Sequence, residues 1–232
     1  MIVELVVVPT RLELERLLAL DSEAARTLRT GLDSGSDIEL RICGFGAIGA
    51  AAFVARRLAA GGVDSVTLLG LAGSYDPADT LVGSAHAATA VQLAEAGAGF
   101  GDAFVDLSTL GFPVASVEDR SIFSQLVCPR DEPPAPPLAS AEFPLTQVHL
   151  TVHAASGSTD QADERARRNP GAQVEEMEAF GIALACASAA VRFRSIRGVS
   201  NRAGDRNVAG WRIDEALRAA SDEWLQGRSE AA

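Results

Sequence analysis

Short apolar runs alternate along the chain with segments whose apolar residues recur at helical spacing. The first run, Ile2 to Val8, is rich in β-branched residues and bounded by Pro9, which is typical of a strand buried on both faces. The segment Leu12 to Leu20 follows with helical spacing, and the same alternation recurs to the end of the chain. Strands are predicted at 2–8, 37–43, 66–69, 145–152 and 195–199, and helices at 12–20, 50–60, 176–191 and 213–225.

This alternation predicts an α/β fold, a single domain over residues 1–226 with a largely parallel mixed central sheet flanked by helices. Six of the ten prolines fall in 128–144, which predicts a long irregular loop, with a linker between two domains as the alternative. Residues 227–232 are expected to fray. Ligands should bind where the carboxyl ends of strands open into small-residue loops, which are predicted at 70–74, 154–158 and 200–204.

The net charge of the chain excludes some kinds of binding partner. With 20 Lys+Arg against 31 Asp+Glu the formal net charge is −11, so we expect the chain to bind neither nucleic acid nor anionic membrane surfaces. The sequence contains no Lys, which excludes a Schiff base, an amine nucleophile and a P-loop lysine. No apolar run approaches the roughly 18 residues that a membrane-spanning helix needs.

The cysteines and histidines do not form a metal-binding pattern. Cys43 and Cys186 lie in apolar runs, where a small buried thiol is the simpler interpretation. His86, His149 and His153 are far along the chain from any cluster of Cys or carboxylate residues. We therefore expect no metal site, and a reduced, cytoplasmic setting.

One glycine-rich run, Gly44-Phe45-Gly46-Ala47-Ile48-Gly49, matches the fingerprint of dinucleotide-binding folds and lies between a predicted strand and a predicted helix. Such a site also needs an acidic residue near the end of the next strand, roughly 20 residues further on. Asp64 has that spacing but starts its strand, which puts its carboxylate at the wrong end of the sheet. The alternative is that the glycines let the helix pack closely on the sheet, and no cofactor is predicted.

Polar residues lie at the edges of two apolar segments, a predicted helix and a predicted strand. Glu175, Glu176 and Glu178 open a helix that is otherwise almost wholly apolar. Acids at such a place can simply complement the helix dipole, but Glu178 should lie near the core, where a carboxylate usually has a partner. Asn201 follows a strand predicted to be central, so its amide either completes a turn or contacts a ligand.

Four pieces of sequence, spread over nearly the whole chain, carry a family resemblance. They are the first strand with Glu13, Gly70-Leu71-Ala72-Gly73, Val174-Glu175-Glu176-Met177-Glu178, and Ile196-Arg197-Gly198-Val199-Ser200-Asn201. In this order they resemble the nucleoside phosphorylase and nucleosidase superfamily, whose members cleave the N-glycosidic bond of nucleosides. The polar segment Ser200 to Arg206, with Trp211, is similar to the futalosine hydrolases, a branch that releases hypoxanthine from futalosine in menaquinone biosynthesis. The resemblance therefore implies a hydrolase with a nucleoside phosphorylase-like fold.

The resemblance also implies roles for individual residues. Glu13 would orient or deprotonate the attacking water, with Glu15 as the alternative for this role. Glu178 would hold the ribose hydroxyls and favour the cationic sugar of the transition state, and Asn201 would hydrogen-bond the departing base. Further substrate contacts are implied for Leu71, Ala72, Gly73, Thr159, Glu176, Met177, Ser200, Ala203 and Trp211.

The resemblance, together with the chemistry of a few side chains, predicts which base is released and which nucleophile attacks the sugar. Relatives that act on adenine nucleosides have Asp where this chain has Asn201, and an amide fits the oxygen and ring N–H of hypoxanthine better. Asp76 and Asp79 follow the segment 70–74 and would repel phosphate, so water is the predicted nucleophile. The expected partners are a purine nucleoside, water and, by the resemblance, further copies of the chain in a homo-oligomer.

Two other functions stay open. A methylthioadenosine or S-adenosylhomocysteine nucleosidase would share Glu13 and Glu178 but should have Asp in place of Asn201. A non-catalytic nucleoside-binding module would keep the pocket, although pure binding gains little from paired acids beside an apolar site.

Overall fold

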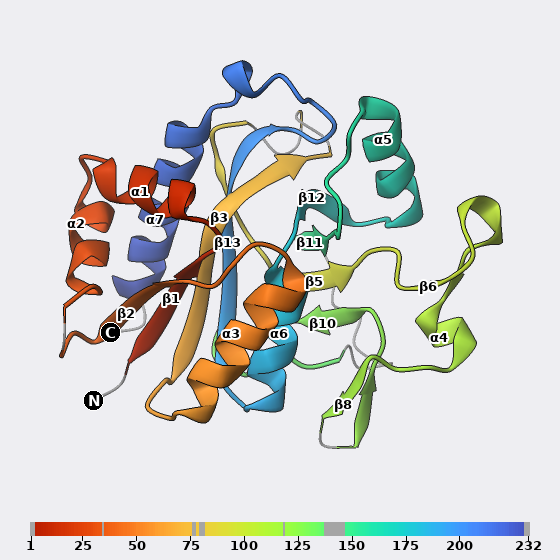
Figure 1. Cartoon of the computed structure of the whole chain (residues 1–232), viewed down its shortest axis with the longest axis horizontal. Helices are drawn as coiled ribbons and strands as arrows, with labels where there is room; N and C mark the ends of the chain where they lie inside the picture. The colour runs from red at the N-terminus through yellow and green to blue at the C-terminus, as the bar shows by residue number, and fades with distance from the viewer. Residues whose placement is uncertain are drawn as a thin grey trace.

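The structure, a computed structural model, describes residues 3–33, 35–75, 78, 82–117, 119–136 and 147–229 (Figure 1). The strands are β1 (Glu4–Val8), β2 (Ile38–Ile42), β3 (Ser65–Ser74), β4 (Ala85–Ala87), β5 (Ala90–Leu93), β6 (Gly97–Ala98), β7 (Val105–Asp106), β8 (Ala115–Val117), β9 (Arg120–Ile122), β10 (Gln125–Val127), β11 (Val148–Thr151), β12 (Ala172–Glu176) and β13 (Arg192–Arg202). The helices are α1 (Arg11–Ala19), α2 (Glu23–Thr30), α3 (Ala47–Ala59), α4 (Leu107–Leu110), α5 (Thr159–Arg168), α6 (Ala179–Ser188) and α7 (Ile213–Ser229), with short 3₁₀ turns at Gly101–Ala103 and Val208–Gly210.

The central sheet has nine strands in the described part of the chain and is mixed but largely parallel. β1 pairs in parallel with β2 and β3, β3 with β13, and β11 with both β5 and β12. The antiparallel pairs are β3 with β12, β4 with β13 and β5 with β10. The predicted α/β architecture is therefore confirmed.

Helices cover both faces of this sheet, and β1 supplies side chains to both cores. Leu5 and Val7 pack in the core cluster beneath α3 and α6, whereas Val6 and Val8 pack in the cluster beneath α1, α2 and α7 (Figure 1). Successive side chains of a strand point to opposite faces, which is why the run is apolar without interruption. Burying each such side chain contributes about 1.5–3 kcal/mol to folding.

Several element boundaries differ from the predicted ones. The segments 70–74 and 200–202 were expected as loops but belong to β3 and β13, whose pairing continues as far as Ser74 and Arg202. The helix predicted from 176 begins only at Ala179, because Glu176 is still paired with Thr151 in the ladder of β12 and β11. Pairing between distant segments therefore overrides the local small-residue pattern.

The two chain segments expected to be irregular are described in part. Residues 128–136 carry a single bridge, between Val127 and Ala135, while 137–146 lie outside the described residues, as do Asp76 and Asp79. The fraying expected from 227 does not occur over 227–229, because α7 continues to Ser229 and Arg130 donates a 2.9 Å hydrogen bond to the carbonyl of Gly227. Residues 230–232 lie outside the described part.

Gly198 gives a test of how tightly β13 packs on α7. A Cβ at this position would overlap the carbonyl group of Ala216, so we expect Gly198→Ala to lower the free energy of unfolding by about 1–3 kcal/mol, as overpacking usually does. Gly49→Ala is the matched control, because a Cβ there meets nothing within 4 Å and Ala favours the helix. Urea unfolding measures both variants, and equal stabilities would contradict this packing.

Candidate active site

A cavity of about 310 Å³ opens at the carboxyl end of the central sheet. Its lining comes from residues that end or follow β1, β3, β11, β12 and β13, together with the turn before α3. Parallel sheets bind their ligands at this edge, and the sequence predicted a site there. The cavity is therefore the candidate active site.

The cavity brings together most of the residues singled out by the sequence. Glu13, Glu178 and Asn201, the three predicted catalytic residues, all line it. The lining also includes seven of the predicted substrate contacts, Leu71, Ala72, Gly73, Glu176, Met177, Ser200 and Trp211.

Two predicted substrate contacts, Thr159 and Ala203, are not part of this lining. Thr159 is the exposed first residue of α5, which begins there because Ser158 caps the helix by accepting a hydrogen bond from the Gln161 N–H. Ala203 is 1% exposed and packs so closely on Gly73 that a Cβ on this glycine would lie 3.1 Å from the Ala203 Cα. The cap of α5 thus explains why Thr159 lies outside the cavity, and the packing against Gly73 explains why Ala203 does.

Glu13 is held at the start of α1 by groups on both of its oxygens. Thr10, the N-cap, accepts a hydrogen bond from the Glu13 N–H and donates its hydroxyl to Glu13 Oε2 at 2.6 Å, while the Leu71 N–H donates to Oε1 at 3.0 Å. Glu13 is buried, whereas Glu15 is exposed and paired with Arg11 at 2.7 Å. Of the two candidates for handling water, only Glu13 lines the cavity.

A fully buried arginine, Arg197, joins the carboxylates of the site. Its Nη2 donates to both Glu176 and Glu178, while its Nε and Nη1 have no hydrogen-bond partner among the described residues. A Cβ on Gly70 would overlap Arg197 Nη1 and lie 2.9 Å from Glu13 Oε1, so the glycine makes room for both groups. Burial works against the guanidinium charge, but the neighbouring carboxylates raise the pKa of Arg197, which stays protonated.

The role of Arg197 was missed at the level of sequence. The available signal was an Arg inside an otherwise apolar strand, because a buried guanidinium must have carboxylate or carbonyl partners. Here those partners are the acids that the sequence did single out, on β12 and at the start of α6.

Glu176 and Glu178 differ in how many protein donors they accept. Glu176 accepts from the Thr151 hydroxyl, Arg197 and the N–H groups of Glu178 and Ala179. Among the described residues, Glu178 accepts only from Arg197, at 2.8 Å, and from the Gly46 N–H, at 2.9 Å. Each Glu178 oxygen therefore keeps capacity for a substrate hydroxyl, whereas Glu176 is occupied in holding the site together.

Burial raises the pKa of Glu178 above its ordinary value, and the negative charge of Glu176 adds to this effect. Arg197 and the Gly46 N–H act in the opposite direction. Gly46 is also the N-cap of α3, so the carboxylate lies at the positive end of a helix. Burial dominates among these effects, so the proton affinity of Glu178 is higher than that of an ordinary glutamate.

The glycine-rich run thus donates a hydrogen bond to one carboxylate of the site, from the Gly46 N–H to Glu178. Gly44 and Gly46 have φ of +96° and +86°, which side chains rarely adopt, and the turn between them places Phe45 in the cavity lining. The close packing that we considered for these glycines is found at another residue, Gly181 of α6, where a Cβ would overlap the Ala47 carbonyl. Asp64 accepts a 3.0 Å hydrogen bond from the Val3 N–H at the opposite end of β3.

Asn201 lies beside a bulge in β13, at Ser200, where the register with β3 shifts. Its Oδ1 accepts the Ser200 hydroxyl at 2.7 Å and its Nδ2 donates to the Arg202 carbonyl at 2.7 Å. These two bonds fix which edge of the amide donates and which accepts. One N–H and one lone pair remain for a ligand.

The loop 154–158 is tied to the site by a buried carboxylate, Glu175. Ser156 donates both its N–H, at 2.9 Å, and its hydroxyl, at 2.6 Å, to Glu175, which also accepts the Tyr75 hydroxyl at 3.1 Å. Arg165 donates to the Ser156 hydroxyl at 2.9 Å from the outer side. Of this loop, only Ala155 lines the cavity.

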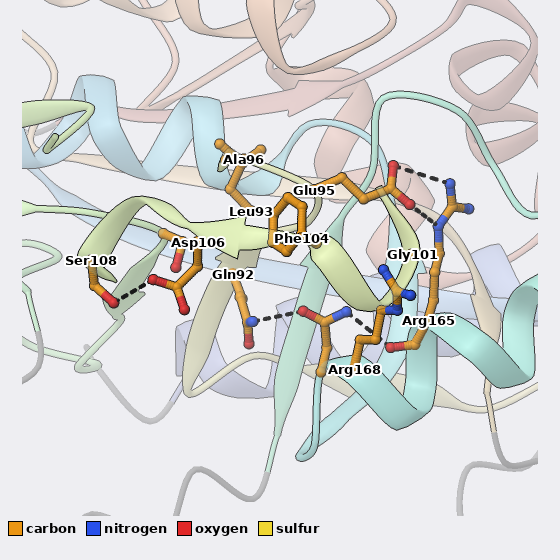
Figure 2. A pocket seen from close by; sticks show the side chains of 12 residues that line it. Gln92, Leu93, Glu95, Ala96, Gly101, Phe104, Asp106, Ser108, Arg165 and Arg168 are labelled. Carbon is orange, nitrogen blue, oxygen red and sulfur yellow. Dashed lines mark hydrogen bonds and ion pairs between the residues drawn. The ribbon is translucent and has the colours of Figure 1, made fainter. Parts of the chain in front are cut away.

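A second cavity, of about 390 Å³, lies between β5, α5 and the segment 101–108 (Figure 2). Most of its polar groups are paired with one another: Gln92 with Asn169 at 2.8 Å, Glu95 with Arg165 at 2.9 Å, and Asp106 with Ser108 at 2.6 Å (Figure 2). Such satisfied groups leave little for a ligand to bind. The first cavity remains the stronger candidate.

A buried histidine pair beside Arg197 should make folding sensitive to acid. His86 and His149 lie 3.1 Å apart through ring nitrogens, and burial lowers the pKa of both below 6.5. As the pH falls below 6.5 the unfolded chain binds protons that the folded chain does not, so stability falls. We expect His86→Gln with His149→Gln to flatten this loss in urea unfolding followed against pH. Exposed His153→Gln is the control, and equal slopes in all three proteins would contradict the expectation.

Neither a membrane span nor a metal cluster is found in the described residues. No helix there is long and apolar enough to cross a membrane. The same residues hold no group of three or more His, Cys, Asp or Glu side chains that could bind a metal ion.

Comparison with known sequences identifies the family. The model of the phosphorylase superfamily matches residues 5–226. The futalosine hydrolase of Streptomyces coelicolor is 35% identical over 163 residues, which cover 68% of this chain and 63% of the relative, or less than two thirds of its length. The futalosine hydrolase of Thermus thermophilus is 34% identical over 176 residues, which cover 76% of this chain and 74% of the relative.

Solved structures share the fold. The 5′-methylthioadenosine/S-adenosylhomocysteine nucleosidase of Helicobacter pylori has a TM-score of 0.69 at 14% identity, with 99% of both chains covered. The futalosine hydrolase of the same species has a TM-score of 0.67 at 15% identity, with 99% of this chain and 97% of that chain covered. Identities this low show the fold alone, whereas the sequence matches go further and show that the chain belongs to the phosphorylase superfamily.

Proposed function

We propose that the chain hydrolyses the N-glycosidic bond of futalosine and releases hypoxanthine, as a step of menaquinone biosynthesis. The observation that carries the proposal is the arrangement of Glu13 and Glu178 around buried Arg197 in one cavity with Asn201. The sequence relatives named futalosine hydrolases support the choice of substrate. The proposal includes no cofactor.

The carboxylates of the cavity can stabilise a sugar that becomes positively charged during the reaction. Cleavage of an N-glycosidic bond passes through an oxocarbenium-like transition state, which a nearby anion stabilises. Glu178 supplies that anion and accepts the ribose hydroxyls with the oxygen capacity that Gly46 and Arg197 leave free. The positive charge develops only in the transition state, so this interaction favours it over the bound substrate.

Glu13 can activate water because it lines the cavity, whereas Arg197 is fully buried behind the lining. Glu13 can accept a proton, and the unpartnered Nη1 of Arg197 lies against the same glycine, Gly70, as Glu13 Oε1. A phosphate nucleophile would instead meet a lining that includes four carboxylates, Glu13, Glu175, Glu176 and Glu178. Water is therefore the nucleophile in this proposal.

Asn201 can form hydrogen bonds with hypoxanthine as the base leaves the sugar. Its free N–H can donate to an acceptor of the base and its free lone pair can accept a ring N–H. We expect Asn201→Asp to lower kcat/KM for futalosine about tenfold to a hundredfold, because the carboxylate repels the charge that builds on the base. Initial-rate kinetics measure the change. An unchanged kcat/KM would remove Asn201 from base recognition.

A base-release assay tests the proposal. The purified chain is incubated without phosphate with futalosine, inosine or methylthioadenosine, and the freed base is identified chromatographically. Hypoxanthine from futalosine is the expected result. Adenine from methylthioadenosine, with futalosine left intact, would show the adenine-nucleosidase alternative instead, and no base from any substrate would favour a binding module.

We further propose that the chain works in the cytoplasm as a homo-oligomer. Large apolar side chains exposed at the cavity and on the first turn of α3 support the assembly: Leu12, Phe45 and Ile48 are 54%, 67% and 78% exposed. Burying them against a second copy would remove apolar surface from water. Light scattering of the purified chain checks the mass, and a monomer at all concentrations would contradict the proposal.

A further inference from the structure

One buried carboxylate of the cavity lining, Glu175, is not assigned a step in the proposed reaction. It is 6% exposed, and protein donors occupy both of its oxygens. Oε1 accepts the Ser156 N–H at 2.9 Å, while Oε2 accepts the hydroxyls of Ser156, at 2.6 Å, and Tyr75, at 3.1 Å. These bonds leave Glu175 little capacity for a substrate, so any effect on the reaction passes through its partners.

Arg165 supplies the opposite charge from the outer side of this group. Its Nη1 donates to the Ser156 hydroxyl at 2.9 Å and lies 3.6 Å from Glu175 Oε2, while its Nε pairs with Glu95 at 2.9 Å (Figure 2). Burial and the charge of Glu175 raise the pKa of Tyr75, so its hydroxyl keeps the proton that it donates. A buried polar group satisfied in this way holds its members in one arrangement.

Ser156 connects this group to the wall of the cavity. It belongs to the loop 154–158, of which Ala155 lines the cavity. Ser156 is buried, whereas the other four residues of the loop are exposed. The two bonds from Ser156 to Glu175 therefore anchor the loop from its buried side and set the position of Ala155 in the wall.

The same loop lies on the side of the cavity that carries Asn201. Gly204 follows Asn201 by three residues and also lines the cavity. A Cβ on Gly204 would overlap the Ser158 carbonyl, so the loop packs directly on the chain that leaves Asn201. Asn201 is the residue proposed to hydrogen-bond the base, which places the anchored loop beside the base as well.

We infer that Glu175 is a positioning residue, which holds Ser156 and thereby fixes the loop that, with Asn201, receives the purine base. The inference rests on the proposed nucleosidase function and adds a residue to it. Contacts between this wall and the base exist in the bound nucleoside as well as in the transition state. A misplaced loop therefore weakens binding more than it slows the chemical step, unlike the loss of Glu178.

Glu175→Gln tests this role, because it keeps the size of the side chain but replaces one accepting oxygen by an N–H₂ group. We expect KM for futalosine to rise about tenfold, the value of a lost hydrogen bond to a charged group, with kcat within about threefold of wild type. The dissociation constant of hypoxanthine alone, measured by calorimetry, should rise by a similar factor.

Two further variants separate this contact from a general effect of the substitution. Glu164→Gln is the matched control, because Glu164 is exposed on α5 and accepts from Arg167 and Arg168, and it should leave KM unchanged. Ser156→Ala removes one of the two bonds to Glu175, so KM should rise about threefold. Adding Ser156→Ala to Glu175→Gln should change KM little further, because both variants break the same contact.

The outcomes are distinct. A parallel rise of KM and of the hypoxanthine dissociation constant in Glu175→Gln supports the inference, whereas a wild-type KM, or a loss of kcat at unchanged KM, overturns it. Should Glu175→Gln fail to fold, a raised KM in Ser156→Ala supports the inference and a wild-type KM overturns it. If the wild type leaves futalosine intact, the proposed function fails instead, and the hypoxanthine dissociation constants still decide: equal values in wild type and variant overturn the role of Glu175.

Discussion

Replacing Glu178 by Gln is expected to lower kcat for base release by about 10²–10⁴-fold, the range typical of a lost catalytic carboxylate. The amide keeps the size of the side chain but removes the anion that stabilises the cationic sugar, and it sets an N–H₂ group against Arg197 or the Gly46 N–H. Single-turnover assays with futalosine measure the loss. Glu15→Gln is the control, because Glu15 is exposed on the outer side of α1 and paired with Arg11.

The pH dependence of kcat/KM in the wild-type protein should reflect the protonation of Glu178. Since burial raises the pKa of Glu178, kcat/KM should begin to fall, as the solution is acidified, at a pH above that of an ordinary glutamate. The fall occurs because protonation removes the anion. Full activity in Glu178→Gln, with folding intact by circular dichroism, would remove Glu178 from the mechanism.

Replacing Arg197 by Met is expected to lower the free energy of unfolding by about 3–5 kcal/mol, the usual cost of removing one partner of a buried ion pair. Arg197 is wholly buried, and its loss leaves Glu176 and Glu178 close together without a cation. Urea unfolding gives the change, and base-release kinetics on the folded fraction should show a loss of activity as well.

A matched surface variant separates the buried pair from the general effect of removing an arginine. Arg202→Met breaks the pair with Asp163 in which both side chains are about half exposed, so it should change stability by no more than about 1 kcal/mol. Adding Glu176→Gln to Arg197→Met should restore part of the stability, because it removes one of the unpaired charges. Equal stability of the Arg197 and Arg202 variants would contradict the network.

The order of strands and helices could be predicted because each element carries a local apolar pattern. The run 2–8 is apolar without interruption because alternate residues of β1 face two different cores, and that continuity is visible in the sequence. The ends of the elements could not be predicted equally well. β3 and β13 continue to Ser74 and Arg202 because they pair with each other, and such pairing over a long sequence separation leaves no local trace.

Residues of the candidate site could be predicted where a side chain carries the proposed chemistry. The motifs placed Glu13, Glu178 and Asn201, and all three meet in one cavity. Gly46 was not assigned a role, because it acts through its main-chain N–H and only the glycine pattern marks it. Thr159 lies outside the cavity lining because it is the exposed first residue of α5, and its position depends on where that helix begins.

The central claim is that this cavity cleaves futalosine with water. The most direct measurement is to incubate the chain with futalosine in phosphate-free water enriched in heavy oxygen and to analyse both products by mass spectrometry. The expected result is free hypoxanthine together with a sugar product that carries the heavy oxygen, and neither product from Glu178→Gln on the same time scale. No base release, or release only after phosphate is added and without heavy oxygen in the sugar, would contradict the claim.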